Sequence, residues 1–182
     1  MQKWFALILI ILFSCGEKPK ATASFVNGGG DSSILSIEAV RRNYERSYSR
    51  PTTFSGIDEG KPGEEIRIAG KYYCVLNNEL SIPEKLIPDN KQEFKTHEFA
   101  TDIVIISNKD TILRKTITIK DFNGNLPANL SEYGVLAEPV FIGYNEKADE
   151  FDFHFGISIP LTNTAVSRIA GIKRNRELVI RE

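Results

Sequence analysis

The sequence predicts a mainly β fold, an antiparallel β-sandwich or a partly closed barrel with one short N-terminal helix. From about residue 64 onward, six to eight short segments are rich in β-branched and aromatic residues, as strands are. Turn-rich connectors separate them: GIDEGKPGEE (56–65), IPEKLIPDN (82–90) and FNGNLP (122–127). Strands and helices do not alternate, which argues against a parallel α/β sheet.

The first 14 residues have the pattern of an export signal. Lys3 gives a positive start, and 4–13 is an apolar run of about half the roughly 20 residues that a helix needs to span a bilayer. A charged start, a short apolar segment and then a small residue, here Ser14, are typical of a cleaved secretory signal. We therefore expect residues 1–14 to be a removable signal peptide.

The end of this segment resembles the lipobox of bacterial lipoproteins, with Leu12, Phe13, Ser14 and Cys15 in the four positions. The resemblance implies that Cys15 receives a diacylglycerol through a thioether, becomes the new N-terminus and is acylated, for instance with palmitate. Two or more chains, each contributing about 0.8 kcal/mol per buried CH₂, anchor a protein stably. The Asp that retains some lipoproteins at the inner membrane is absent after Cys15. We therefore expect a cell-envelope protein on the outer membrane, facing the periplasm or the surface; an ordinary cleaved signal and an uncleaved anchor are the alternatives.

Residues 15–33 are predicted to be the lipidated cysteine and a flexible tether. Gly, Ser, Ala, Lys and Pro dominate 16–33, and such a segment buries too little apolar surface to fold. Its root-mean-square reach is roughly 25 Å. Removal of the signal leaves 168 of the 182 residues, enough for this tether and a single β-rich domain at 34–182.

A short helix is predicted at about 36–48. Ile37, Val40, Tyr44 and Tyr48 recur at helical spacing and define one apolar face. The other face is expected to be charged and solvated. An alternative, contact with anionic lipid headgroups, comes from its four arginines: Arg41, Arg42, Arg46 and Arg50.

The β region has one strand with clear alternation, at 151–159, where apolar and polar residues take opposite faces. The apolar run at 98–107 is consistent with a strand buried on both faces. Pro139 indicates an edge or a bulge within 135–145. The last 16 residues predict a hairpin that turns near Arg174 and Asn175.

Four segments resemble small uncharacterised lipoproteins of Gram-negative bacteria: NNELSIPEKLIP, FKTHEF, TILRKTITIKDF and FDFHFGISIP. The resemblance covers roughly residues 64–165. It implies a β-rich domain and an envelope location, and it implies no particular activity.

Charge argues against nucleic-acid binding, and cysteine content suggests a structural thiol. The net charge is −1, and loss of Lys3 with the signal leaves 22 basic and 24 acidic side chains. A nucleic-acid-binding protein would carry a basic excess, so no nucleic acid is expected as a partner. Cys74 is the only other cysteine, and we expect a buried, inert thiol.

One segment, 121–132, has the spacing of a twelve-residue calcium loop. Oxygen-bearing side chains occupy positions 1, 3, 5, 9 and 12, but position 6 is Leu126, where such loops need glycine. A plain inter-strand loop is the favoured interpretation, and calcium is the one cofactor that the sequence suggests. The five possible ligands are Asp121, Asn123, Asn125, Asn129 and Glu132.

The expected function is a non-enzymatic binding or assembly module, with no catalytic residues. Its partners would be the membrane, through the lipid on Cys15, and an envelope protein or glycan. A structural envelope lipoprotein is one alternative. The other is a hydrolase that uses His97 or His154, although neither histidine lies in a motif that supplies a second catalytic or metal-binding group.

Overall fold

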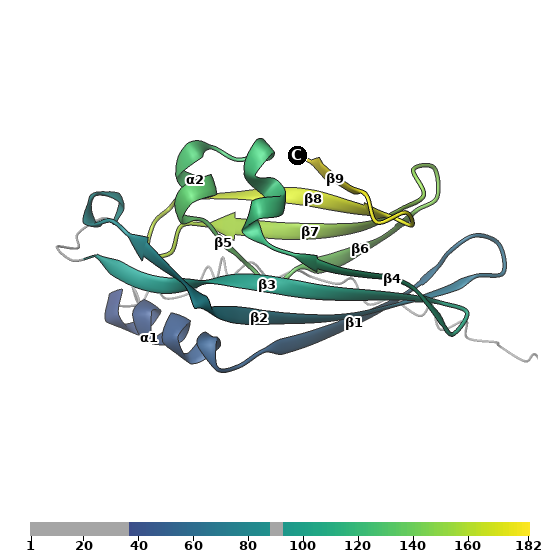
Figure 1. Ribbon diagram of the computed structural model, residues 1–182, viewed down its shortest axis with the longest axis horizontal. Coiled ribbons are helices and arrows are strands. Elements are labelled where there is room, and N and C mark those ends of the chain that lie inside the picture. Colours follow the sequence, from purple (N-terminus) through teal and green to yellow (C-terminus); the bar gives the residue numbers. More distant parts are fainter. Residues whose placement is uncertain (1–36, 88–92) are drawn as a thin grey trace, which may run out of the picture. The chain divides into compact units, whose positions relative to one another are not determined.

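The computed structural model describes residues 37–87 and 93–182, and within them nine strands form two antiparallel sheets (Figure 1). No strand in this part of the chain pairs with both sheets, so the predicted β-sandwich is confirmed and the barrel is not formed. The signal peptide, Cys15 and the tether lie outside the described residues. None of the helices described here is long and apolar enough to cross a bilayer.

The first sheet contains β1 to β4 in chain order, each antiparallel to the next. A single 3₁₀ turn, η1, follows its second strand at Glu84–Leu86. β2 and β3 are far longer than the short strands that the sequence predicted. The bounds are β1 Thr52–Glu59, β2 Glu65–Ile82, β3 Phe94–Ser107 and β4 Asp110–Ile117.

The second sheet has β7 and β8 at its centre and β9 at one edge. β5 and β6 both pair with β7 and form the other edge. Pro139 lies between these two strands, which confirms the predicted edge position, although the sequence did not predict the break. Arg174 and Asn175 lie in the β8–β9 turn, which confirms the predicted hairpin. The bounds are β5 Val135–Leu136, β6 Val140–Asn145, β7 Glu150–Ser158, β8 Ala165–Lys173 and β9 Leu178–Arg181.

The core lies between the two sheets because each inner face is apolar at every second residue. On β7, the alternation predicted from the sequence buries Phe151, Phe153 and Phe155 completely. Ile68 and Ile105 are among the buried residues of the first sheet. Each such side chain contributes about 1.5–3 kcal/mol through its removal from water.

The prediction that 98–107 is buried on both faces is wrong for its second half. Ile103 and Ile105 are buried, whereas Val104 and Ile106 on the opposite face are only half-buried. The physical reason is that this part of the first sheet has its second layer on the inner face alone.

The predicted N-terminal helix is confirmed as α1, Ile37–Tyr48, which packs on β2 and β3 (Figure 1). Tyr44 meets the ring of Phe94 edge-on at 5.9 Å between centroids. The Tyr48 hydroxyl donates a hydrogen bond to Thr96 Oγ1 at 2.8 Å. The tyrosines of its predicted apolar face therefore fix the helix to the first sheet.

Two segments that were expected to be connectors are regular structure. Residues 56–59 belong to β1, which pairs with β2 over its whole length. Residues 119–133 form two short helical elements, η2 at Ile119–Asn125 and α2 at Ala128–Tyr133. Thr118 and Asp121 form a capping box at the start of η2, which satisfies backbone donors that a loop would leave to solvent.

Candidate interaction surface

The strands β1 and β6 are edge strands of different sheets, and they lie against each other. Asp58 Oδ2 accepts a hydrogen bond from the backbone N–H of Tyr144 at 2.6 Å. The ring of Phe141 fills the space beside Gly56, where an added Cβ would lie 2.9 Å from its Cδ1. These two strands therefore form one side of the sandwich, which we call the open side.

Most of the exposed aliphatic side chains belong to the two strands of the open side. Among the described residues, four large hydrophobic side chains are exposed, and three of them belong to β1 and β6: Ile57 (75% exposed), Val140 (42%) and Ile142 (55%). The fourth, Leu76, lies on β2 and is 62% exposed. Single exposed aliphatic residues are ordinary, whereas a group of them is typical of an interaction site.

β1 also has the features of a strand that can accept another strand. Its eight residues pair with β2 without a bulge, and none of them is Lys, Arg or Pro. Phe54 leans over Gly70 of β2, away from the free edge, because an added Cβ on Gly70 would lie only 2.0 Å from its Cζ. A long, regular edge with unpaired backbone groups is a template for strand pairing.

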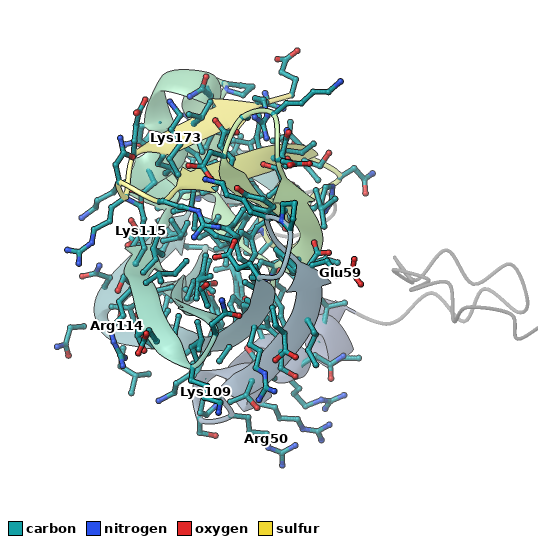
Figure 2. The ribbon with its side chains drawn as sticks, turned by 90° about the vertical axis from the view of Figure 1, so that its right-hand side faces the viewer. Arg50, Glu59, Lys109, Arg114, Lys115 and Lys173 are labelled. Carbon is teal, nitrogen blue, oxygen red and sulfur yellow. The ribbon has the colours of Figure 1, made fainter. Side chains whose placement is uncertain are left out.

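The opposite side of the sandwich, formed by β4 and β9, lacks these features, and we call it the closed side. The β3–β4 pairing is interrupted by an irregularity at Ile105 and Ile106. β4 carries exposed Arg114 and also Lys115, whose Nζ donates to the carbonyl oxygen of Arg176 at 3.4 Å. Figure 2 shows Arg114 and Lys115 on one flank of the domain and Glu59, the last residue of β1, on the other. Bulges and basic residues prevent edge pairing.

At the hairpin end of the sandwich, an ion-pair network joins the two sheets. Arg174, from the β8–β9 turn, contacts Glu64 of the β1–β2 turn at 2.7 Å and Asp149 of the β6–β7 turn at 3.0 Å. Lys61 approaches Asp149 at 3.3 Å. The hydrogen bond from Arg174 lowers the pKa of Glu64 to about 2. The charged side chains of this network therefore pair with one another and hold three turns together.

Tyr144 completes this network from the side of β6. Its hydroxyl donates to Asp149 Oδ1 at 2.5 Å, and this bond lowers the pKa of that carboxyl group. The guanidinium of Arg174 lies 5.3 Å from the centroid of the Tyr144 ring and 5.4 Å from that of Phe151, at the range of a cation–π contact. These contacts stabilise the hairpin end of the domain.

A second charged cluster lies on the outer face of the second sheet. Arg181 of β9 makes ion pairs with both Glu150 and Asp152 of β7. The Glu150 side chain is only 5% exposed, and both carboxylates occupy the space that a side chain on Gly171 would need. A buried carboxylate requires such a partner, so Arg181 holds the last strand in place.

The five possible calcium ligands lie in a helical segment in place of the expected loop. Asp121 Oδ2 accepts from the Thr118 backbone N–H at 2.8 Å, and Asn123 Oδ1 accepts from the Ser131 hydroxyl at 2.9 Å. Asn125, Asn129 and Glu132 are exposed on η2 and α2. Within the described residues, no group of three or more His, Cys, Asp or Glu side chains could hold a metal ion. Helical turns replace the inter-strand loop, and calcium binding stays a prediction.

The two histidines lie in different sheets. His97, on β3, meets the Tyr48 ring edge-on at 4.9 Å, and its Nδ1 is buried with no hydrogen-bond partner among the described residues. His154, on β7, shares the outer face of the second sheet with Asp152 and is paired in register with Ile169. The geometry therefore gives the hydrolase hypothesis no shared site.

Cys74 lies on β2, directly opposite Phe99 of β3, and is half-buried. Burial raises the pKa of its thiol, which disfavours the thiolate that a nucleophile requires. Cys74 and His97 both approach Tyr48 of α1. The predicted burial of Cys74 is therefore only partial, and its inertness stays a prediction.

The arginines of α1, and Arg50 just after it, divide into two kinds. Arg41 lies over the Phe94 ring at 5.2 Å and packs the helix on β3. Arg42, Arg46 and Arg50 are exposed. Only these three are available to an anionic surface, and contact with lipid headgroups stays an alternative.

A scan against protein-family models and a search of curated proteins found no match to this chain.

The residues of the open side were not singled out by the sequence analysis. Ile57 was placed in a connector, and Val140 and Ile142 appeared only as part of a strand next to Pro139. The signal that could have found Ile57 is the alternation of Phe54, Gly56 and Asp58 with outward-facing residues. Glycines at 56 and 60 obscured it, because glycine usually indicates a turn.

Proposed function

We propose that this protein is a lipid-anchored, non-enzymatic binding and assembly module of the bacterial cell envelope, and that it recognises its partner through the open side. The observation that carries this proposal is the exposure of Ile57, Val140 and Ile142 on two neighbouring edge strands. The lipobox resemblance at Cys15 supports the anchor, the outer membrane and the envelope location.

The chemistry of the open side favours a protein partner over a glycan. A free strand edge offers alternating backbone donors and acceptors, which another backbone matches by β-augmentation. Ile57 on β1 and the exposed Val140 and Ile142 on neighbouring β6 offer apolar contacts to an incoming strand. The partner is therefore an extended protein segment with apolar residues at alternate positions.

Site-specific photo-crosslinking in living cells tests this function. A photoreactive amino acid is placed at Ile57 or at Ile142 of the full chain, and the matched control carries it at Leu76, which is exposed on β2. We expect discrete adducts from positions 57 and 142 and none from 76. The same adducts from all three positions, or none from 57 and 142, would contradict the proposal.

The anchor is tested separately by Cys15→Ser. The variant should move from the membrane fraction to the soluble fraction, whereas Ile57→Lys should stay in the membrane fraction. An unchanged partition of the Cys15→Ser chain would count against lipidation. It would not affect the crosslinking result, because that experiment tests the open side independently.

A further inference from the structure

The edge of β1 is suited to one occupant in particular. We propose that a second copy of this chain pairs with it, β1 antiparallel to β1, across a two-fold axis perpendicular to the first sheet. The inference rests on the proposed function, since it names the partner of the open side. The two four-stranded sheets would then form one continuous sheet of eight strands.

Symmetry restricts the possible registers. Directly opposed residues of an antiparallel pair point to the same face, and a two-fold interface brings residue i to j′ and j to i′. On β1 the even-numbered residues face inward, as half-buried Phe54, Gly56 and Asp58 show, and Ile57 faces outward. The axis must therefore pass through a residue, and the candidates are Phe54, Ser55 and Gly56.

Only the register centred on Ser55 matches the side chains well. It sets Thr53 opposite Ile57′ on the outer face, two β-branched residues that pair well across strands. On the inner face it sets Phe54 opposite Gly56′, and the Phe54 ring already leans away over Gly70. A centre at Phe54 would put Ile57 opposite Pro51′, which has no N–H to donate. A centre at Gly56 would oppose two glycines.

The charges at the ends of the strand select antiparallel pairing. Exposed Arg50 precedes β1, and exposed Glu59 ends it (Figure 2). Antiparallel pairing brings the basic end of one β1 near the acidic end of the other, at both ends of the interface. A parallel arrangement would bring like charges together, which suppresses the wrong pairing.

The same axis brings the strand β6 of each copy near the interface, because β6 lies against β1. Val140 and Ile142, which are exposed in the single chain, belong to this strand. The axis therefore places the strands that carry all three exposed aliphatic residues of the open side beside the partner copy.

A lipid anchor would favour this pairing. An edge of eight residues buries a small area, and interfaces below about 1,200 Å² are weak between free molecules. Two chains tethered to one membrane meet at a raised effective concentration, which strengthens binding without a new contact. The pair is therefore expected on the membrane and is best trapped there.

Disulfide trapping in membranes of cells that produce the full chain tests the proposal. Opposed residues in an antiparallel pair have Cα atoms about 4.5–5.5 Å apart, within the range of a disulfide. Under mild oxidation, Ser55→Cys should give a covalent dimer at least tenfold above the unsubstituted chain. The matched control is Thr111→Cys at an exposed position on β4, which should give no increase.

A mixed experiment tests the register. Thr53→Cys and Ile57→Cys chains should each stay monomeric when produced alone, because residue 57 and its copy 57′ would be four residues apart along the strands, roughly 13 Å. Produced together, they should form a disulfide-linked pair. Failure of this pair would overturn the register even if Ser55→Cys dimerises.

Ser55→Cys dimers no more abundant than those of Thr111→Cys would overturn self-pairing. The outcome is distinguishable from failure of the proposed function. If photo-adducts from position 57 contain only other proteins, the proposed binding function stands, but a second copy is not its partner. Absence of any adduct would reject both.

Discussion

The two edges of the first sheet, β1 and β4, differ in their regularity, their basic residues and their exposed apolar side chains, three features that affect strand pairing. β1 is regular over eight residues, carries no basic residue and exposes Ile57. β4 has the same length, but its pairing is irregular, and it carries Arg114 and Lys115 (Figure 2). One sheet therefore contains both a protected edge and an unprotected edge.

This comparison shows that the regular, unprotected edge is a feature of β1 and not a general property of the fold. Proteins protect edge strands against unwanted pairing, and this chain does so at β4, with the short β9 beside it. The second sheet's edge on the open side, β6, is also irregular, between Phe141 and Gly143. β1 is thus the one long, regular edge in the part of the chain that the structure describes.

The largest effect on the free energy of unfolding is expected from substitution of Arg181 on the closed side. Arg181→Ala leaves the Glu150 carboxylate, 5% exposed, without its ion pair, and removal of one partner from such a pair costs about 3–5 kcal/mol. Urea unfolding of the full chain measures the loss. Arg176→Ala, at an exposed site in the neighbouring turn, is the control and should change the free energy of unfolding by less than about 0.5 kcal/mol. A loss below about 1 kcal/mol for Arg181→Ala would show that the charged cluster does not hold β9.

A smaller loss is expected where β1 is fixed to β2. Gly70→Ala places a Cβ 2.0 Å from Phe54 Cζ, and the displaced ring should lower the free energy of unfolding by about 1–3 kcal/mol. Gly124→Ala, where nothing lies within 4 Å of the added Cβ, is the matched control. Phe54→Ala combined with Gly70→Ala should cost less than the sum of the single changes. Equal stability of the Gly70→Ala and Gly124→Ala chains would refute this packing.

The hairpin network predicts a pH dependence of stability. The pKa of Glu64 is about 2 in the folded chain and 4.5 ordinarily, chiefly because Arg174 donates to it. A lowered folded-state pKa stabilises the protein above about pH 4.5, and that stability is lost as the pH falls toward 2. Allowing for solvent screening, the loss is about 1–2 kcal/mol. Chemical unfolding at pH 7 and pH 2.5 should show a smaller decrease for Glu64→Gln than for the unsubstituted chain; parallel decreases would contradict the assignment.

The smallest effect on stability is expected at the open side itself. Ile57→Lys gives β1 the kind of charge that β4 already carries, and because Ile57 is 75% exposed, the free energy of unfolding should change by less than about 0.5 kcal/mol. The same change should abolish the Ser55→Cys dimer. A stability loss above 1 kcal/mol would mean that Ile57 packs within its own chain, and an undiminished dimer would mean that it has no part in pairing.

Elements fixed by local pattern were predicted from the sequence. The apolar spacing of Tyr44 and Tyr48 was sufficient for α1, and the alternation of phenylalanines from Phe151 was sufficient for β7. In both cases the periodicity lies within a single element and needs no knowledge of its neighbours. The general β-sandwich followed from the number of such segments.

Elements fixed by distant pairing were missed. Gly56 and Gly60 read as turn residues, but Gly56 is opposite Ile68, and long-range pairing with β2 makes the segment a strand. β2 continues past Asn77 through a register shift between Val75 and Glu79, which no local signal marks. The open side was missed for the same reason, because the exposure of Ile57 depends on which strand lies beside it.

The strand order has a consequence for how the chain assembles. Every partner in the first sheet is a neighbour in sequence, so this meander is complete at Ile117, before any residue of the second sheet is required. Such local connectivity gives a low contact order and favours rapid folding for a β protein. A chain that emerges N-terminus first therefore passes through a half-built stage with the apolar face of Ile68 and Ile105 uncovered. Truncation after Ile117 should therefore give an insoluble product. The second sheet thus acts as an intramolecular cover for the apolar face of the first sheet.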